Sequence, residues 1–525
     1  MPEKVPESKF QTIANARKLE FAARSGAIWH ARRHMVFSAW PFLLVFLPIT
    51  LIGFVSIPAP FRTARKLWLC VASVVFYAYW KFEYVPLLFF SIALNYAVAE
   101  LLTRCQSVRK AKSILTVGVT ANLLLLGYFK YTNFILKAVF GLTHQPFHRL
   151  DIILPLAISF FTFTQISYLV DVYRDRNLHY GLLDYTLFVV FFPHLIAGPI
   201  VRHWEIIPQY EKRNLQPLRV DWAVGLALFL FGLYKKRLLA DPISVYANAV
   251  YNAAQAGEMV NFSSAWLGTI AYALQIYFDF SGYSDMAIGL ARMFGIRFPM
   301  NFDSPYRAAS IIEFWQRWHI TLTRFLREYL YYPLGGNRRG ATRQSVNIMI
   351  TMLLSGLWHG AGWNFVMWGG LHGCYLLAAH EWRRFREYRG WNWNHWSYRG
   401  ACVLVTFVAV LFAWVLFRAP NLAVASNVFS AMIGMQGKGL AAPMDYAAAL
   451  KLIVPLLALA FCLPNVQRLL AEYEPVLENV PTPVGRLAVR VRLNAFTGVF
   501  LGICFFAVVR IHFYAASSPF LYFNF

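Results

Sequence analysis

The sequence predicts an all-α protein that crosses a membrane many times. Its 525 residues are 58% hydrophobic and only 14% charged, whereas a soluble domain carries about 25% charged residues. The net charge of +24 comes from basic residues in short runs between apolar segments, which is the pattern of positive-inside anchoring. This distribution argues against nucleic acid as a partner and favours a polytopic helical bundle in membrane lipid.

The first 34 residues form a basic extension, and the membrane domain is expected to cover 35–525. The apolar run 40–57 is long enough to span a bilayer, so the extension does not have the pattern of a cleaved signal peptide. The loops expected in the cytoplasm are those with Arg62, Arg65 and Lys66 and with Arg104, Arg109, Lys110 and Lys112. This topology puts the basic extension outside, against the positive-inside rule. Either the extension lies on the membrane surface or, as we favour, translation begins at Met35.

Apolar runs predict roughly 11 to 14 membrane segments, some of them re-entrant or interfacial. The run 191–199 contains two prolines, which remove backbone donors and predict a broken helix. Broken backbone at membrane depth needs protein or a water-filled cavity around it, so we expect a polar tunnel. The other candidate spans are 67–80, 86–102, 113–129, 152–172, 184–200, 222–234, 264–278, 346–358, 362–380, 400–417, 450–463 and 496–515.

Costly polar groups gather in the stretch 277–373, which is therefore the candidate functional region. His359 lies between Trp358 and Gly360 at the end of an apolar run. Glycine allows a ligand to approach closely, and a neutral imidazole is a natural general base for a hydroxyl. The alternative is a histidine that only hydrogen-bonds a backbone carbonyl.

The segment 313–328 predicts an amphipathic helix that lines a cavity or lies at the membrane interface. His319 and Trp315 are four residues apart and would share one face of this helix. The alternative to a tunnel-lining role is an interfacial belt of aromatic and basic side chains. Two further pairs have the spacing of helical ion pairs, Glu313–Arg317 and Arg324–Glu328.

Asp279 and Asp285 are expected either to bind a polar substrate or to hold a cationic side chain inside the bundle. We favour pairing for Asp285 and leave Asp279 open. The glycine-rich basic turn 335–340 offers amides and guanidinium groups to a phosphate, although it lacks the spacing of a P-loop. No metal-ligand spacing appears. The candidate substrate- or donor-binding residues are Asp279, Trp315, Arg317, Trp318, Asn337, Arg338, Trp358 and Asn364, the last as a candidate oxyanion donor.

Several motifs outside this stretch resemble the membrane-bound O-acyltransferase family. They are Phe129-Lys130-Tyr131, 154–163, 168–174 and 192–199. Together with 277–373, they make the chain similar to the bacterial alginate O-acetylation branch, with teichoic acid D-alanyl transferases as relatives. The resemblance covers nearly all of 35–525. It implies a helical bundle around a narrow tunnel, with a histidine pair at His319 and His359 and His359 as the catalytic base.

The resemblance also implies acyl transfer across a bacterial inner membrane without a bound cofactor. The expected donor is acetyl-CoA on the cytoplasmic side. The expected acceptor is an exported polysaccharide or a periplasmic acetyltransferase of the SGNH type, and the polysaccharide export machinery is an expected partner. Two alternatives stay open: D-alanyl transfer from a carrier protein, and a transporter component that moves acyl groups or polysaccharide without chemistry of its own.

Overall fold

The computed structural model describes residues 35–211, 215–391, 393, 395–436, 444–480, 490–514 and 520–521. Within these ranges the chain forms helices and connecting segments and contains no β-strand. The predicted all-α class is therefore confirmed. The basic extension 1–34 lies outside the described residues, so the two explanations for it remain predictions.

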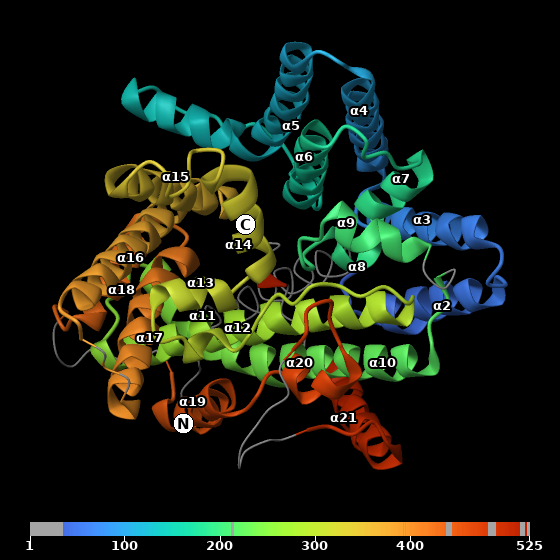
Figure 1. The fold of residues 1–525 in the computed structure, drawn as a ribbon. Coiled ribbons are helices and arrows are strands. Elements are labelled where there is room, and N and C mark those ends of the chain that lie inside the picture. Colours follow the sequence, from blue (N-terminus) through green and yellow to red (C-terminus); the bar gives the residue numbers. More distant parts are fainter. Residues whose placement is uncertain are drawn as a thin grey trace, which may run out of the picture.

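The α-helices pack together into one bundle (Figure 1). Among the described residues, three helical stretches are long and apolar enough to cross a membrane: Phe82–Arg104, Val108–Leu142 and Trp396–Arg418. In chain order the helices are α2 (Leu47–Ser56), α3 (Arg62–Ala78), α4 (Val85–Arg104), α5 (Val108–Leu142), α6 (Ile158–Arg174), α7 (Leu182–Val190), α8 (Phe192–Leu195), α9 (His203–Ile206), α10 (Arg219–Tyr234), α11 (Asp241–Gln255), α12 (Phe262–Met293), α13 (Ile311–Arg317), α14 (Ile320–Leu326), α15 (Ala341–His359), α16 (Trp363–Tyr388), α17 (Trp396–Arg418), α18 (Leu422–Met432), α19 (Tyr446–Cys462), α20 (Val466–Leu469) and α21 (Ala495–Tyr514). Two π-helical segments also matter below, η5 (Lys235–Ala240) and η7 (Arg327–Tyr331).

Helix α12 is the buried centre of the bundle, and α10 runs beside it (Figure 1). The two backbones approach closely because glycines face each other across the contact. A Cβ atom built on Gly232 would lie 2.4 Å from the carbonyl oxygen of Gly282. Small residues allow this close approach in membrane bundles, where van der Waals packing replaces much of the hydrophobic driving force.

Replacing Gly232 with alanine is therefore expected to destabilise the protein by about 1–3 kcal/mol, since the added methyl group overpacks a backbone contact. The measurement is thermal unfolding in detergent. Gly127 on α5 is the matched control, because a Cβ atom there meets nothing within 4 Å. Gly127→Ala should be neutral or stabilising by up to about 1 kcal/mol. Equal loss of stability in both variants would contradict this account of the α10–α12 contact.

The predicted break in 191–199 is confirmed, whereas two helices longer than ten residues were missed. Helix α7 ends at Val190, α8 covers only four residues, and the backbone then stays non-helical up to His203. No span was predicted at α11 or α18. Polar residues on one side of α11 lower its average hydropathy, but its apolar side packs on α12, so tertiary contact stabilises a helix that a hydropathy window overlooks.

Candidate functional site

His359 is the last residue of α15 and is 4% exposed. Its ring is enclosed by aromatic rings whose centroids lie 5.0 Å away at Trp368 and 5.2 Å away at Phe417. A Cβ atom on Gly360 would lie 2.2 Å from the ring of Phe365. The glycine beside His359 therefore makes room for a side chain of the protein itself, and not for a ligand as the sequence analysis proposed.

The end of α15 is held by two residues from α5. Lys130 donates a hydrogen bond to the carbonyl oxygen of Trp358, and the Tyr131 hydroxyl donates to that of Leu357 at 2.9 Å. These bonds satisfy carbonyls that a helix end leaves without partners, and the ammonium lies at the negative end of the helix dipole. The sequence analysis did not assign Lys130 to the site, although a lysine inside an apolar helix was a usable signal.

His319 does not lie in an amphipathic helix, so that prediction was wrong. Helix α13 ends at Arg317, and His319 adopts the left-handed conformation, with φ of 43°, directly before α14. This conformation costs a non-glycine residue about 1–2 kcal/mol. The break turns the fully buried imidazole away from the α13 face and onto Phe280 of α12, with ring centroids 4.8 Å apart.

Trp358 brings the two histidines together. Its ring centroid lies 6.4 Å from that of His319 and 4.9 Å from that of His359. Lys130 Nζ lies 5.9 Å from the ring centroid of Trp358, and the ring of His372 contacts Trp368 with centroids 4.8 Å apart. The structure thus gathers residues far apart in the sequence into one buried cluster of imidazoles, an ammonium and aromatic rings.

Asn301 orients His319 and was missed by the sequence analysis. Its Oδ1 atom lies 3.1 Å from Nδ1 of His319 and accepts a bond from the Thr321 hydroxyl at 2.9 Å, while its Nδ2 atom donates to Ser284 at 3.0 Å. Because Oδ1 is an acceptor, it selects the tautomer with a proton on Nδ1 and a lone pair on Nε2. A fully buried asparagine requires such partners, but the sequence does not reveal which ones.

Replacing Asn301 with alanine is expected to lower the rate of the acyl transfer that the sequence resemblance implies about 10²-fold, because small errors in position have effects of this size. The rate should be measured in membranes that contain equal amounts of inserted protein. Ser284→Ala is the control, since it removes one bond to Asn301 and none to His319. A rate for Asn301→Ala equal to that of the control would contradict the positioning role.

The aromatic candidates serve the packing of the cluster. Trp315 contacts the ring of His372, with centroids 5.1 Å apart, and Trp318 contacts Trp414 at 4.9 Å. Trp358 stacks on Phe163 at 5.1 Å. All three predicted tryptophans are buried, and Trp358 contacts the rings of both His319 and His359.

The polar candidates have different surroundings. Arg317 forms the predicted ion pair with Glu313 at 2.8 Å. Asn364 donates to the carbonyl oxygen of Ala419 at 2.9 Å, so its amide fastens the end of α17, which argues against an oxyanion-binding role. Asn337 and Arg338 lie exposed in the turn after η7, away from the buried cluster of histidines.

The two buried aspartates hold lysines and not arginines. Asp285 forms an ion pair with Lys235 at 2.6 Å, which agrees with the pairing that we favoured. Asp279 pairs with Lys236 at 2.7 Å and accepts a bond from the backbone of Leu521 at 2.9 Å. Both acids therefore fasten α12 to the π-helical segment η5, and this role argues against Asp279 as a substrate ligand.

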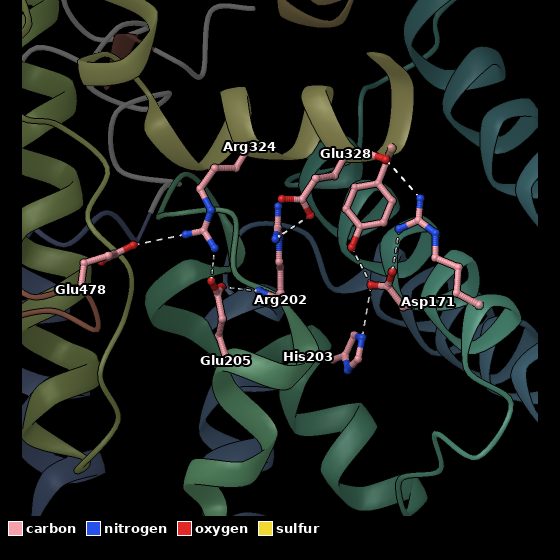
Figure 2. A network of polar contacts seen from close by, with 9 residues as sticks. Asp171, Arg202, His203, Glu205, Arg324, Glu328 and Glu478 are labelled. Carbon is pink, nitrogen blue, oxygen red and sulfur yellow. Dashed lines mark hydrogen bonds and ion pairs between the residues drawn. The ribbon is translucent and has the colours of Figure 1, made fainter. Parts of the chain in front are cut away.

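A charged network fixes the segment that follows His319 (Figure 2). The predicted pair Arg324–Glu328 was wrong, because a π-helical turn changes the helical register after Leu326. Arg324 instead bonds Glu205 at 2.5 Å and Glu478 at 3.2 Å. Glu328 pairs with Arg202 at 2.7 Å. These contacts tie α14 and η7 to α9 and to the loop after α20.

A cavity of about 1600 Å³ lies beside the cluster. Lys130 and the segment 361–364 line it, so it reaches the residues directly after His359. The rest of its wall comes from the second half of α5, the segment 147–154 and the residues after α17. Among the described residues no group of three or more histidine, cysteine, aspartate or glutamate side chains has the arrangement of a metal site.

Apolar helices around a buried cluster of histidines define a helical membrane protein with an ionisable site inside its bundle. The family model of the membrane-bound O-acyltransferases matches residues 67–417. The chain belongs to this family and is therefore an O-acyltransferase.

Individual relatives refine this placement. The chain is 40% identical to the peptidoglycan O-acetyltransferase of Helicobacter pylori, over 77% of this chain and 81% of that protein. It is 38% identical to the probable alginate O-acetylase AlgI of Pseudomonas putida, over 94% of this chain and the whole of that protein. The teichoic acid D-alanyltransferase of Streptococcus thermophilus is more distant, at 26% identity over 50% of this chain and 68% of that protein.

Proposed function

We propose that this protein transfers acetyl groups from a cytoplasmic thioester, acetyl-CoA, to hydroxyls outside the bacterial inner membrane. The acceptor is an exported polysaccharide or a periplasmic acetyltransferase of the SGNH type that passes the group on. The observation that carries the proposal is the meeting of His319 and His359 at Trp358, with the large cavity beside His359. The relatives named as O-acetylases favour acetyl as the group.

The distribution of charge supports a path across the membrane. Basic residues gather where α5 begins and just before α17 begins, at Arg109, Lys110 and Lys112 and at Arg383, Arg384, Arg386 and Arg389. By the positive-inside rule these ends face the cytoplasm. The large cavity lies at the opposite ends of both helices, and we therefore assign it to the acceptor's side of the proposed path.

The chemistry needs a base and close positioning. His359 takes the proton of the acceptor hydroxyl while the hydroxyl oxygen attacks the carbonyl carbon of the thioester. The carbon–sulfur bond then breaks, and the leaving thiolate receives the proton, so acetyl ester and free thiol are formed without any redox partner. General-base help contributes about 10²–10⁴-fold, and holding donor and acceptor together inside the bundle contributes more. His319 is proposed to line the donor's part of the path.

The donor assay tests the proposal. Purified protein in liposomes receives acetyl-labelled CoA on its cytoplasmic side and a soluble polysaccharide on the other side. We expect label in the polysaccharide, or in the partner acetyltransferase when that protein is supplied, and none with His359→Ala. Transfer only from an acyl-loaded carrier protein would favour the D-alanyl alternative, for which the more distant relatives provide some support. Movement of acyl groups without a new ester would favour the transporter.

A further inference from the structure

A second cavity, of about 390 Å³, lies at the other end of α17. It is formed by the first turns of α17, the end of α19, the arginine of α20, Arg317 of α13 and the turn from Ser304 to Arg307. Ser304 lies in the left-handed region, with φ of 46°. Such strain in a non-glycine residue is frequent at functional sites. Neither the buried histidines nor the large cavity uses this region.

Four arginines line this cavity and outnumber their acidic partners. Glu313 pairs with Arg317 at 2.8 Å and lies 3.5 Å from Arg399. Asp303 accepts two hydrogen bonds from the guanidinium group of Arg468, at 2.8 and 2.9 Å. Asp303 also lies 3.7 Å from Arg317. Within the described part of the chain, no carboxylate lies at ion-pair distance from the fourth arginine, Arg307. Two carboxylates therefore face four guanidinium groups, and the cavity keeps an excess of positive charge.

Apart from Ser304, the remaining side chains of the cavity wall are apolar. Trp396, Val403 and Phe461 line it together with the arginines. The arginine-rich segment 383–389 precedes α17, so the cavity lies at the cytoplasmic membrane interface, where tryptophan rings also collect. A soluble phosphate needs no apolar wall, whereas a phospholipid has a phosphate and an adjoining acyl chain.

We propose that this cavity binds a phosphate group at the cytoplasmic interface, and that an anionic phospholipid supplies it. The guanidinium groups of Arg307 and Arg399 bind the phosphate through charge-assisted bonds. The first segment of an acyl chain lies along Val403 and Phe461. Basic pockets between membrane helices on the cytoplasmic side have the chemistry for such headgroups. Bound lipid would fasten α17 and α19 to the turn 304–307.

The test is native mass spectrometry of the full chain. The protein is incubated in detergent with phosphatidylglycerol, phosphatidylcholine or coenzyme A, and the ligand that stays bound after release from the detergent is measured. We expect retained phosphatidylglycerol in the natural protein and about tenfold weaker retention in Arg307→Gln/Arg399→Gln, since both charge-assisted bonds are lost. The single variant Arg307→Gln, whose arginine is exposed, gives an intermediate loss and keeps the test valid if the double variant does not fold.

Arg109→Gln/Lys112→Gln is the matched control, because it removes the same charge from exposed positions at the cytoplasmic end of α5. This control should retain phosphatidylglycerol like the natural protein. The proposal would be overturned if the cavity variant retained as much phosphatidylglycerol as the natural protein. It would also be overturned if the natural protein retained phosphatidylcholine as well as it retains phosphatidylglycerol. Loss of coenzyme A, but not of lipid, in the cavity variant would assign the phosphate to a soluble ligand and overturn the lipid source.

Discussion

Replacing His359 with alanine is expected to abolish acetyl transfer while the protein remains folded and inserted. The imidazole lies among Trp358, Trp368 and Phe417, and the rings of Trp368 and Phe417 contact each other without it, with centroids 5.2 Å apart. Loss of a general base lowers a rate about 10²–10⁴-fold. The measurement is the acetyl content of the polymer made by cells that contain the variant, together with the donor assay in liposomes.

His380 supplies the control for this experiment. His380 lies on α16 and is partly exposed, away from the buried cluster. His380→Gln should therefore leave acetylation unchanged. The amount of inserted protein should match in all samples. Normal acetyl content with His359→Ala would eliminate His359 as the base. His319 would then be the remaining candidate for that role.

Replacing Asp285 with alanine is expected to destabilise the protein by about 3–5 kcal/mol, because one partner of a buried ion pair is left uncompensated. The side chains of Asp285 and Lys235 are 2% and 12% exposed, and Gln467 also donates to the carboxylate. Loss of Asp285 leaves an ammonium inside the bundle between α10 and α12. Thermal unfolding in detergent measures the effect.

Two comparisons make this prediction specific. The double variant Lys235→Met/Asp285→Leu should recover most of the stability, since apolar replacement of both partners is often neutral. Glu387→Gln removes an exposed pair with Arg383, whose side chains are 62% and 70% exposed, and such pairs contribute about 0–1 kcal/mol. If Asp285→Ala lost no more stability than Glu387→Gln, the buried pair would not fasten the helices.

The candidate site was predictable where one residue carried its own signal. His359 is costly in an apolar run, and costly polar groups in membranes point to function without knowledge of their partners. Asp285 was recognisable for the same reason. The pairing of Glu313 with Arg317 was predictable because both lie within one helical segment.

The sequence analysis failed where the position of a side chain depends on partners far away in the chain. His319 was placed in a helix because residues 313–328 have helical spacing, but the chain enters the left-handed region at His319. Asn301, which holds its ring, comes from another segment. Arg324 bonds acids 119 and 154 residues away in the chain, and not its helical neighbour Glu328.

The sequence by itself determined a helical membrane protein and the broken segment after Val190, and it predicted His359 as the base. These follow from composition and local spacing, because a bilayer penalises charge and unpaired backbone wherever they occur. Only the tertiary structure decided which groups meet at Trp358, which lysines neutralise Asp279 and Asp285, and where the arginine-lined cavity lies. Those contacts join residues from separate helices, and the packing that selects them is a property of the whole bundle.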